Sequence, residues 1–228
     1  MSQFVLSYGQ GRYYYIKRYI MNQRYKIDRP DGILILVSIL FVISSLVFSY
    51  FASVYATKRA SNPVDDFFLN ILPAVDVTLI FIYGFILFCV FILFLVIRNP
   101  RKLPFIFKSI ALFVVIRSIF VMLTHTAPSP EVAVNYSSFD FILRRIVLSG
   151  DLFFSGHTGF PFLMALLYWN HRRLRVFFAA TAVFFGFIVL LGHLHYSIDV
   201  FSAFFITYGI YRLSQKFFKK ELALFKRE

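Results

Sequence analysis

The chain is poor in cysteine and in charged residues. Cys89 is the single cysteine among 228 residues, which excludes an intrachain disulfide framework, and it lies in an apolar run typical of a buried thiol. Charged residues make up 15% of the chain, and only 11 residues are acidic. Because no internal repeat or low-complexity tract interrupts the sequence, we expect one domain.

Hydrophobic residues are correspondingly abundant. They account for 59% of the chain and include 32 phenylalanines, and the mean hydropathy is +0.73. Soluble globular proteins contain about 45–50% apolar residues. The composition therefore indicates a membrane protein.

Six apolar runs are candidate membrane spans, because a helix needs about 20 mostly apolar residues to cross a hydrocarbon core about 30 Å thick. They do not alternate as the strands of a membrane barrel do. We expect an all-α, polytopic membrane protein with six transmembrane helices, with residues 1–31 as a basic cytoplasmic segment, 32–215 as the membrane domain and 216–228 as a basic cytoplasmic tail. The six runs are residues 32–57, 71–97, 103–124, 155–169, 176–194 and 196–213.

The distribution of basic residues predicts the orientation of these spans. Of the 24 Lys and Arg residues, 19 fall on the side of the two termini, four on the opposite side and one, Arg117, within a span. Loops rich in Lys and Arg stay in the cytoplasm. Both termini are thus predicted to be cytoplasmic. The net charge of +13 needs no nucleic-acid partner to explain it.

Acidic residues and histidines show the opposite bias. Ionisable groups at membrane depth are costly, so each is a candidate functional residue, although any single one is also compatible with a packing role. The group on the non-cytoplasmic side comprises Asp65, Asp66, Asp76, Glu131, Asp140, Asp151, Asp199, His125, His157, His193 and His195.

Two short stretches carry most of this chemistry. In "HYSID", His195 and Asp199 are four residues apart and are expected on one helix face, where the carboxylate orients the imidazole for nucleophilic attack. In "SGHT", Ser155 and Gly156 stand where a helix is expected to begin, and unpaired amides there suit a phosphate. His157 follows and is a candidate general acid. A nucleophile, an orienting carboxylate, an anion-binding helix start and a general acid together indicate phosphoryl transfer. Metal binding by these side chains is a rival, but the spacing favours no metal ion.

These stretches resemble the superfamily of type 2 phosphatidic acid phosphatases, and more closely its sphingomyelin synthase branch. "GDLFFSGHT" (150–158) and "HYSIDVFSAFFIT" (195–207) are similar to that branch's two histidine motifs. "IRSIFVMLTHTAPSP" (116–130), "NPVDDFFLNILP" (62–73) and "DFILRRI" (140–146) are looser matches. The resemblance implies a six-helix lipid phosphatase and phosphotransferase fold, with the active site at the non-cytoplasmic interface.

The resemblance also implies roles for individual residues. His195 would be the nucleophile that becomes phosphorylated, Asp199 would orient it, and His157 would protonate the leaving alcohol. The expected substrate-binding residues are Asp151, Asp140, Ser155, Gly156, Arg117, Arg144 and Arg145. No metal ion or other cofactor is expected. The partners would be a phospholipid donor and a lipid alcohol acceptor, diacylglycerol or ceramide.

Departures from the phosphatase pattern favour the synthase branch. Val189 stands where the phosphatases have Arg, Phe154 stands where they have Pro, and their K-x6-RP motif is absent. We expect a head-group phosphotransferase, in which water can replace the acceptor, in a bacterial inner membrane. The alternatives are a lipid phosphatase acting on phosphatidate or an isoprenoid pyrophosphate, and a transporter or structural membrane protein.

Overall fold

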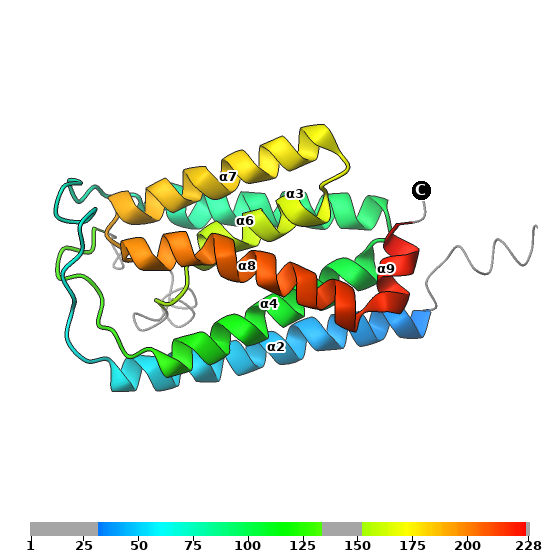
Figure 1. Ribbon diagram of the computed structural model, residues 1–228, viewed down its shortest axis with the longest axis horizontal. Helices are drawn as coiled ribbons and strands as arrows, with labels where there is room; N and C mark the ends of the chain where they lie inside the picture. The colour runs from blue at the N-terminus through cyan, green and yellow to red at the C-terminus, as the bar shows by residue number, and fades with distance from the viewer. Residues whose placement is uncertain (1–31, 134–151, 227–228) are drawn as a thin grey trace, which may run out of the picture.

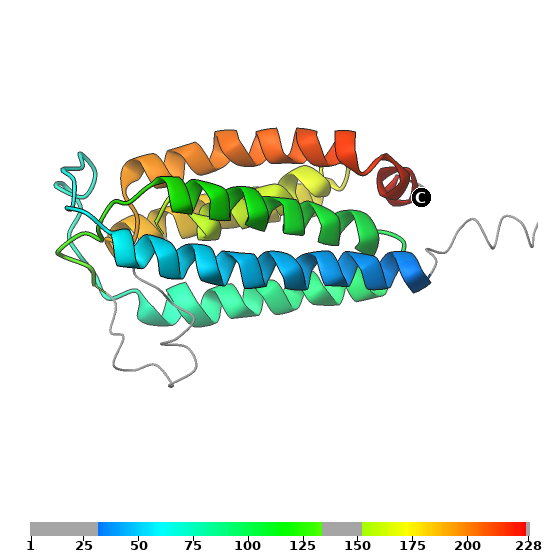
Figure 2. The ribbon, with the colours of Figure 1, turned by 90° about the horizontal axis from the view of Figure 1, so that it is seen from below.

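The computed structural model describes residues 32–133 and 152–226, and every regular element in these ranges is a helix. The elements are α2 (Gly32–Arg59), the π-helix η1 (Ile80–Gly84), α3 (Phe85–Arg98), α4 (Leu103–Leu123), α6 (Gly156–Leu167), α7 (Arg172–Leu191), α8 (Ser197–Phe217) and α9 (Lys219–Phe225). The longer helices lie side by side, and successive helices are joined at alternate ends (Figures 1 and 2).

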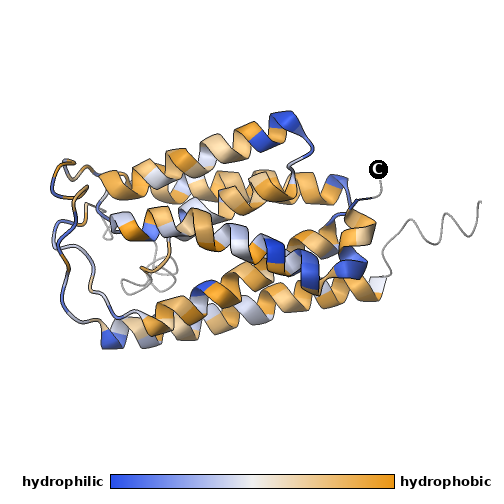
Figure 3. Cartoon of the chain, in the orientation of Figure 1, coloured by the Kyte–Doolittle hydropathy of each residue, from blue (hydrophilic) through white to orange (hydrophobic). Residues whose placement is uncertain are grey.

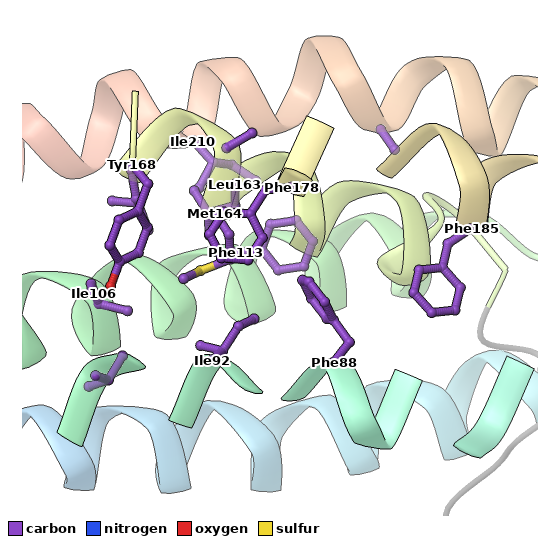
Figure 4. Packing of buried hydrophobic residues seen from close by; sticks show 14 of the residues in the cluster. Phe88, Ile92, Ile106, Phe113, Leu163, Met164, Tyr168, Phe178, Phe185 and Ile210 are labelled. Carbon is purple, nitrogen blue, oxygen red and sulfur yellow. The ribbon is translucent and has the colours of Figure 1, made fainter. Parts of the chain in front are cut away.

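The short helix α6 lies at the centre of the bundle, packed against α7 and α8. Eight of its 12 residues are buried. Large apolar side chains of the neighbouring helices converge on it (Figure 4). The core around α6 includes Phe88, Ile92, Ile106, Phe113, Leu163, Met164, Tyr168, Phe178, Phe185 and Ile210.

Small residues let α2 pack closely along α4. The five buried residues of α2 are all serine or alanine, and Ser38, Ser45 and Ala52 recur every seventh residue. Small side chains allow two helix backbones to approach each other within a membrane. The opposite face of α2 exposes large apolar side chains such as Leu36, Leu46 and Phe51.

Four helices are long and apolar enough to cross a membrane: Gly32–Arg59, Ile80–Arg98, Leu103–Leu123 and Arg172–Leu191. Their residues are largely hydrophobic along the length of each helix (Figure 3). The other two predicted spans are helical but fall short of that standard. Helix α6 has only 12 residues, whereas α8 has 21 residues but is less apolar and carries Asp199, Arg212 and Lys216.

The predicted span at residues 71–97 starts too early. Residues 71–77 are not helical, and the helical turns begin at Thr78. The Asp76 carboxylate accepts a hydrogen bond from the backbone amide of Thr78 at 2.9 Å. This is how an N-cap residue ends a loop and starts a helix. Asp76 is therefore an exposed residue that precedes the helix and is not part of it.

The C-terminal segment contains a helix that the sequence analysis did not predict. Helix α9 packs on α4, and Phe225 contacts the ring of Phe105 with 5.2 Å between centroids. The basic segment 1–31, predicted to be cytoplasmic, lies outside the described residues.

Candidate active site

The first half of the candidate site is the N-terminus of α6. Ser155 is the N-cap residue, and its hydroxyl accepts hydrogen bonds from the amide of Thr158 at 3.4 Å and from the Thr158 hydroxyl at 3.2 Å. Gly156 and His157 then form the start of the helix, as expected from the sequence. Backbone amides in such a first turn, with the helix dipole behind them, favour an anion.

The second half is the turn that leads into α8. Helix α8 begins at Ser197, so His195 precedes it and does not share a helix face with Asp199 as predicted. Instead, the Asp199 carboxylate reaches back toward the N-terminus. One oxygen, Oδ2, accepts the amide of Tyr196 at 3.0 Å and lies 3.4 Å from His195 Nδ1. The two side chains are therefore in contact because Asp199 takes part in capping the helix.

A backbone hydrogen bond joins the two halves. The amide of Ser155 donates to the carbonyl oxygen of Asp199 at 3.0 Å. The side chains of His195 and Asp199 are 7% and 4% exposed. The α6 N-terminus and the histidine–aspartate pair are thus adjacent parts of one protected site.

Arg117 brings a positive charge from α4 to this site. Its Nε donates to the carbonyl oxygen of Phe154 at 2.7 Å. A Cβ atom placed on Gly156 would lie 3.3 Å from that Nε, so the absence of a side chain at Gly156 makes room for the guanidinium. The predicted cation therefore lies beside the amides of α6.

Aromatic side chains hold the imidazole of His157. The ring of Phe81 stacks on it at 4.1 Å and 22°, and the ring of Phe85 lies at 4.1 Å and 40°. Phe81 lies in η1, and π-helical turns are frequent at functional sites. Sequence reasoning missed both phenylalanines because nothing distinguishes them within an apolar run.

Four of the predicted substrate-binding residues lie outside the described residues: Asp140, Arg144, Arg145 and Asp151.

The other two histidines on this side contact loop residues, His193 through its side chain and His125 through its backbone carbonyl. His193 is buried, has a positive φ of 52° and places Nε2 at 3.1 Å from the Leu72 carbonyl oxygen. The His125 carbonyl oxygen accepts both the amide and the hydroxyl of Ser61 at 2.6 Å. Within residues 32–133 and 152–226, no group of three His, Cys, Asp or Glu side chains is arranged to hold a metal ion.

A protein-family model matches part of the chain. Residues 148–216 match the family model described as PAP2 superfamily C-terminal. That stretch contains α6, α7, most of α8 and both halves of the candidate site. No curated protein and no solved structure matches the chain. The match makes this part of the chain similar to the PAP2 superfamily, whose members include phosphatases and phosphotransferases, and the four long apolar helices are compatible with a membrane protein.

Proposed function

We propose that the protein is a phospholipid head-group phosphotransferase, related in activity to the sphingomyelin synthases. The observation that carries the proposal is the contact between His195 Nδ1 and Asp199 Oδ2, beside the N-terminus of α6. A carboxylate at Nδ1 orients the imidazole and leaves Nε2 as the attacking atom. The amides of α6 and the guanidinium of Arg117 suit the negative charge of a phosphodiester.

The reaction has two steps. In the first, His195 Nε2 attacks phosphorus, the bond from phosphorus to the glycerol oxygen breaks, and His157 gives a proton to that oxygen, releasing diacylglycerol. In the second, His157 takes the proton from a lipid alcohol, whose oxygen attacks phosphorus and displaces His195. Asp199 balances the positive charge that develops on the imidazole of His195 in the first step. Water in place of the lipid alcohol gives phospholipase C-like hydrolysis.

The proposal includes the topology. All six predicted spans, the short helix α6 included, would cross the membrane, with both termini in the cytoplasm and the active site facing outward, in a bacterial inner membrane. The distribution of Lys and Arg supports this orientation.

A lipid phosphatase is the second candidate. It rests on the same histidine–aspartate pair and on the family match, because PAP2 superfamily members include phosphatases. The Val189 side chain counts against it, since it is apolar, fully buried and stands where the phosphatases have an arginine.

Purified protein in proteoliposomes distinguishes the two candidates. The donors are phosphatidylcholine, phosphatidylethanolamine or phosphatidate, the acceptors are fluorescent ceramide or diacylglycerol, and the variants are wild type, His195→Ala and His171→Ala. His171 is an exposed residue near Lys102 at the opposite end of the bundle and serves as the control. We expect a new fluorescent phospholipid from wild type and His171→Ala, and a loss of about 10³-fold or more in His195→Ala. Release of phosphate from phosphatidate without a transfer product would contradict the transferase and support the phosphatase.

A further inference from the structure

The two residues that follow His195 are attached to the loops outside the bundle. The Tyr196 hydroxyl donates to the carbonyl oxygen of Ala127 at 2.8 Å and accepts the amide of Val64 at 3.3 Å. Ser197 donates its amide to Asp66 Oδ2 at 2.8 Å and its hydroxyl to Asp66 Oδ1. Residues more than 60 positions earlier in the chain therefore fix the turn that carries the candidate nucleophile.

Asp66 is held firmly in its own loop. Its Oδ1 atom also accepts the amides of Phe68 at 3.0 Å and Leu69 at 3.1 Å. Partial burial raises the pKa of Asp66, but the hydrogen bonds from Ser197, Leu69 and Phe68 outweigh it and lower the pKa below the ordinary value of 3.8. A charged carboxylate thus faces the positive end of α8, where negative charge is stabilising.

Ser197 lies midway between His195 and Asp199 in the chain, so its position decides where those two side chains meet. Asp199 Oδ2 accepts the amide of Tyr196, while Asp66 accepts the amide of Ser197, the first residue of α8. Each of the two carboxylates therefore accepts one amide at this helix end. Asp199 Oδ2 also lies 3.4 Å from His195 Nδ1, so both carboxylates contact the turn that carries His195.

We propose that Asp66 is a positioning residue for the phosphotransfer reaction: it binds Ser197, the first residue of α8, and so holds His195 against Asp199. The proposal rests on the proposed function, and its test has one readout that needs activity and one that does not.

The chain offers a matched control next to Asp66. Asp65 has the same side chain, but its Oδ1 accepts a hydrogen bond from the Asn70 side chain on the exposed surface. The test compares Asp66→Asn, Ser197→Ala, Ser197→Thr and Asp65→Asn. Asparagine keeps one acceptor oxygen and replaces the other with an amide group, which cannot accept from Ser197. Threonine keeps the hydroxyl of Ser197, and alanine removes it.

The first readout is steady-state head-group transfer in proteoliposomes. We expect kcat to fall at least tenfold in Asp66→Asn and Ser197→Ala with KM within about twofold of wild type, since a positioning residue acts on the reacting atoms and not on substrate binding. Ser197→Thr and Asp65→Asn are expected to stay near wild type. A raised KM at unchanged kcat would overturn the proposal, because Asp66 would then contact the substrate. Wild-type kcat in both Asp66→Asn and Ser197→Ala would also overturn it.

The second readout is hydrogen–deuterium exchange of the peptide covering residues 195–200, in variants with wild-type melting temperatures. We expect faster exchange in Asp66→Asn and Ser197→Ala but not in Asp65→Asn. Unchanged exchange in the first two would overturn the proposal whatever the activity. If the wild type transfers no head group but the exchange pattern is as expected, the proposed function fails, whereas the docking of Asp66 on α8 stands.

Discussion

Lys108 and Glu221 form an ion pair between α4 and α9, and their side chains are only 11% and 8% exposed. The ammonium group of Lys108 also lies over the rings of Phe41 and Phe218, at 5.4 and 5.6 Å from their centroids. Removing one partner of a buried pair leaves an uncompensated charge, which costs about 3–5 kcal/mol, whereas replacing both with apolar residues is often neutral. The pair therefore couples the C-terminal helix to the bundle.

Glu221→Leu alone is accordingly expected to lower the melting temperature in detergent, and Lys108→Met alone to do the same. The double variant Lys108→Met/Glu221→Leu is expected to recover most of the loss, because neither charge is then left unpaired. Single variants that melt like the wild type would show that the pair contributes nothing to stability.

At the scale of single residues, the sequence predicted contacts that are local in the chain. His195 and Asp199 are four residues apart and do meet, although helix capping and not a shared helix face brings them together. The sequence could not predict the contact between Lys108 and Glu221, because Glu221 is 113 residues away in a segment expected to be a tail. The hydrogen bond between Ser197 and Asp66 likewise joins residues that are 131 positions apart in the chain.

Among the helices, α6 depends on close packing at one glycine. A Cβ atom on Gly159 would lie 2.8 Å from Thr207 Oγ1 and 2.9 Å from a ring carbon of Phe113, so α6 approaches both α8 and α4 closely there. Gly209 on α8 is the matched control, since a Cβ atom on it would meet nothing within 4 Å.

Gly159→Ala is expected to destabilise the protein by about 1–3 kcal/mol, because overpacking forces neighbouring groups to shift. It should also reduce activity, since Gly159 follows His157 in the same first turns of α6. Gly209→Ala is expected to be neutral or to stabilise by up to about 1 kcal/mol. Chemical denaturation in detergent checks both, and equal effects of the two substitutions would contradict the packing argument.

Apolar runs predicted the existence of the helices better than their ends. Residues 71–77 are apolar enough to resemble a span, yet Asp76 caps the helix that follows. Helix α9 was missed because "KKELALF" is too short and too charged to give a membrane signal. Helix α6 was predicted as residues 155–169, within two residues of its observed ends, because the "SGHT" stretch carries its own N-cap in Ser155.

Over the whole molecule, basic residues gather at the end of the bundle opposite the candidate site. Arg172, Arg173 and Arg175 lie around the start of α7, and Arg212 and Lys216 lie near the end of α8, far from the candidate site (Figures 1 and 3). The positive-inside rule therefore predicts that the candidate site faces away from the cytoplasm.

Cysteine labelling tests this orientation, because Cys89 is the chain's single cysteine and is replaced first by serine. Asn62→Cys then places a thiol at the end of the candidate site, and Arg173→Cys places one at the opposite end; both positions are exposed. In intact bacterial cells, an impermeant maleimide is expected to label Asn62→Cys but to label Arg173→Cys only after permeabilisation. The reverse pattern would contradict the proposed topology.

Trapping the covalent intermediate tests the central claim most directly. Protein mixed with a phospholipid labelled at the phosphate is quenched in alkali, digested and analysed by mass spectrometry, with His195→Ala as the control. We expect the phospho-head-group on His195 of the wild type, as an adduct that alkali preserves and acid releases, and no adduct in the variant. Transfer by the wild type with no adduct on His195, together with full activity of His195→Ala, would contradict the account.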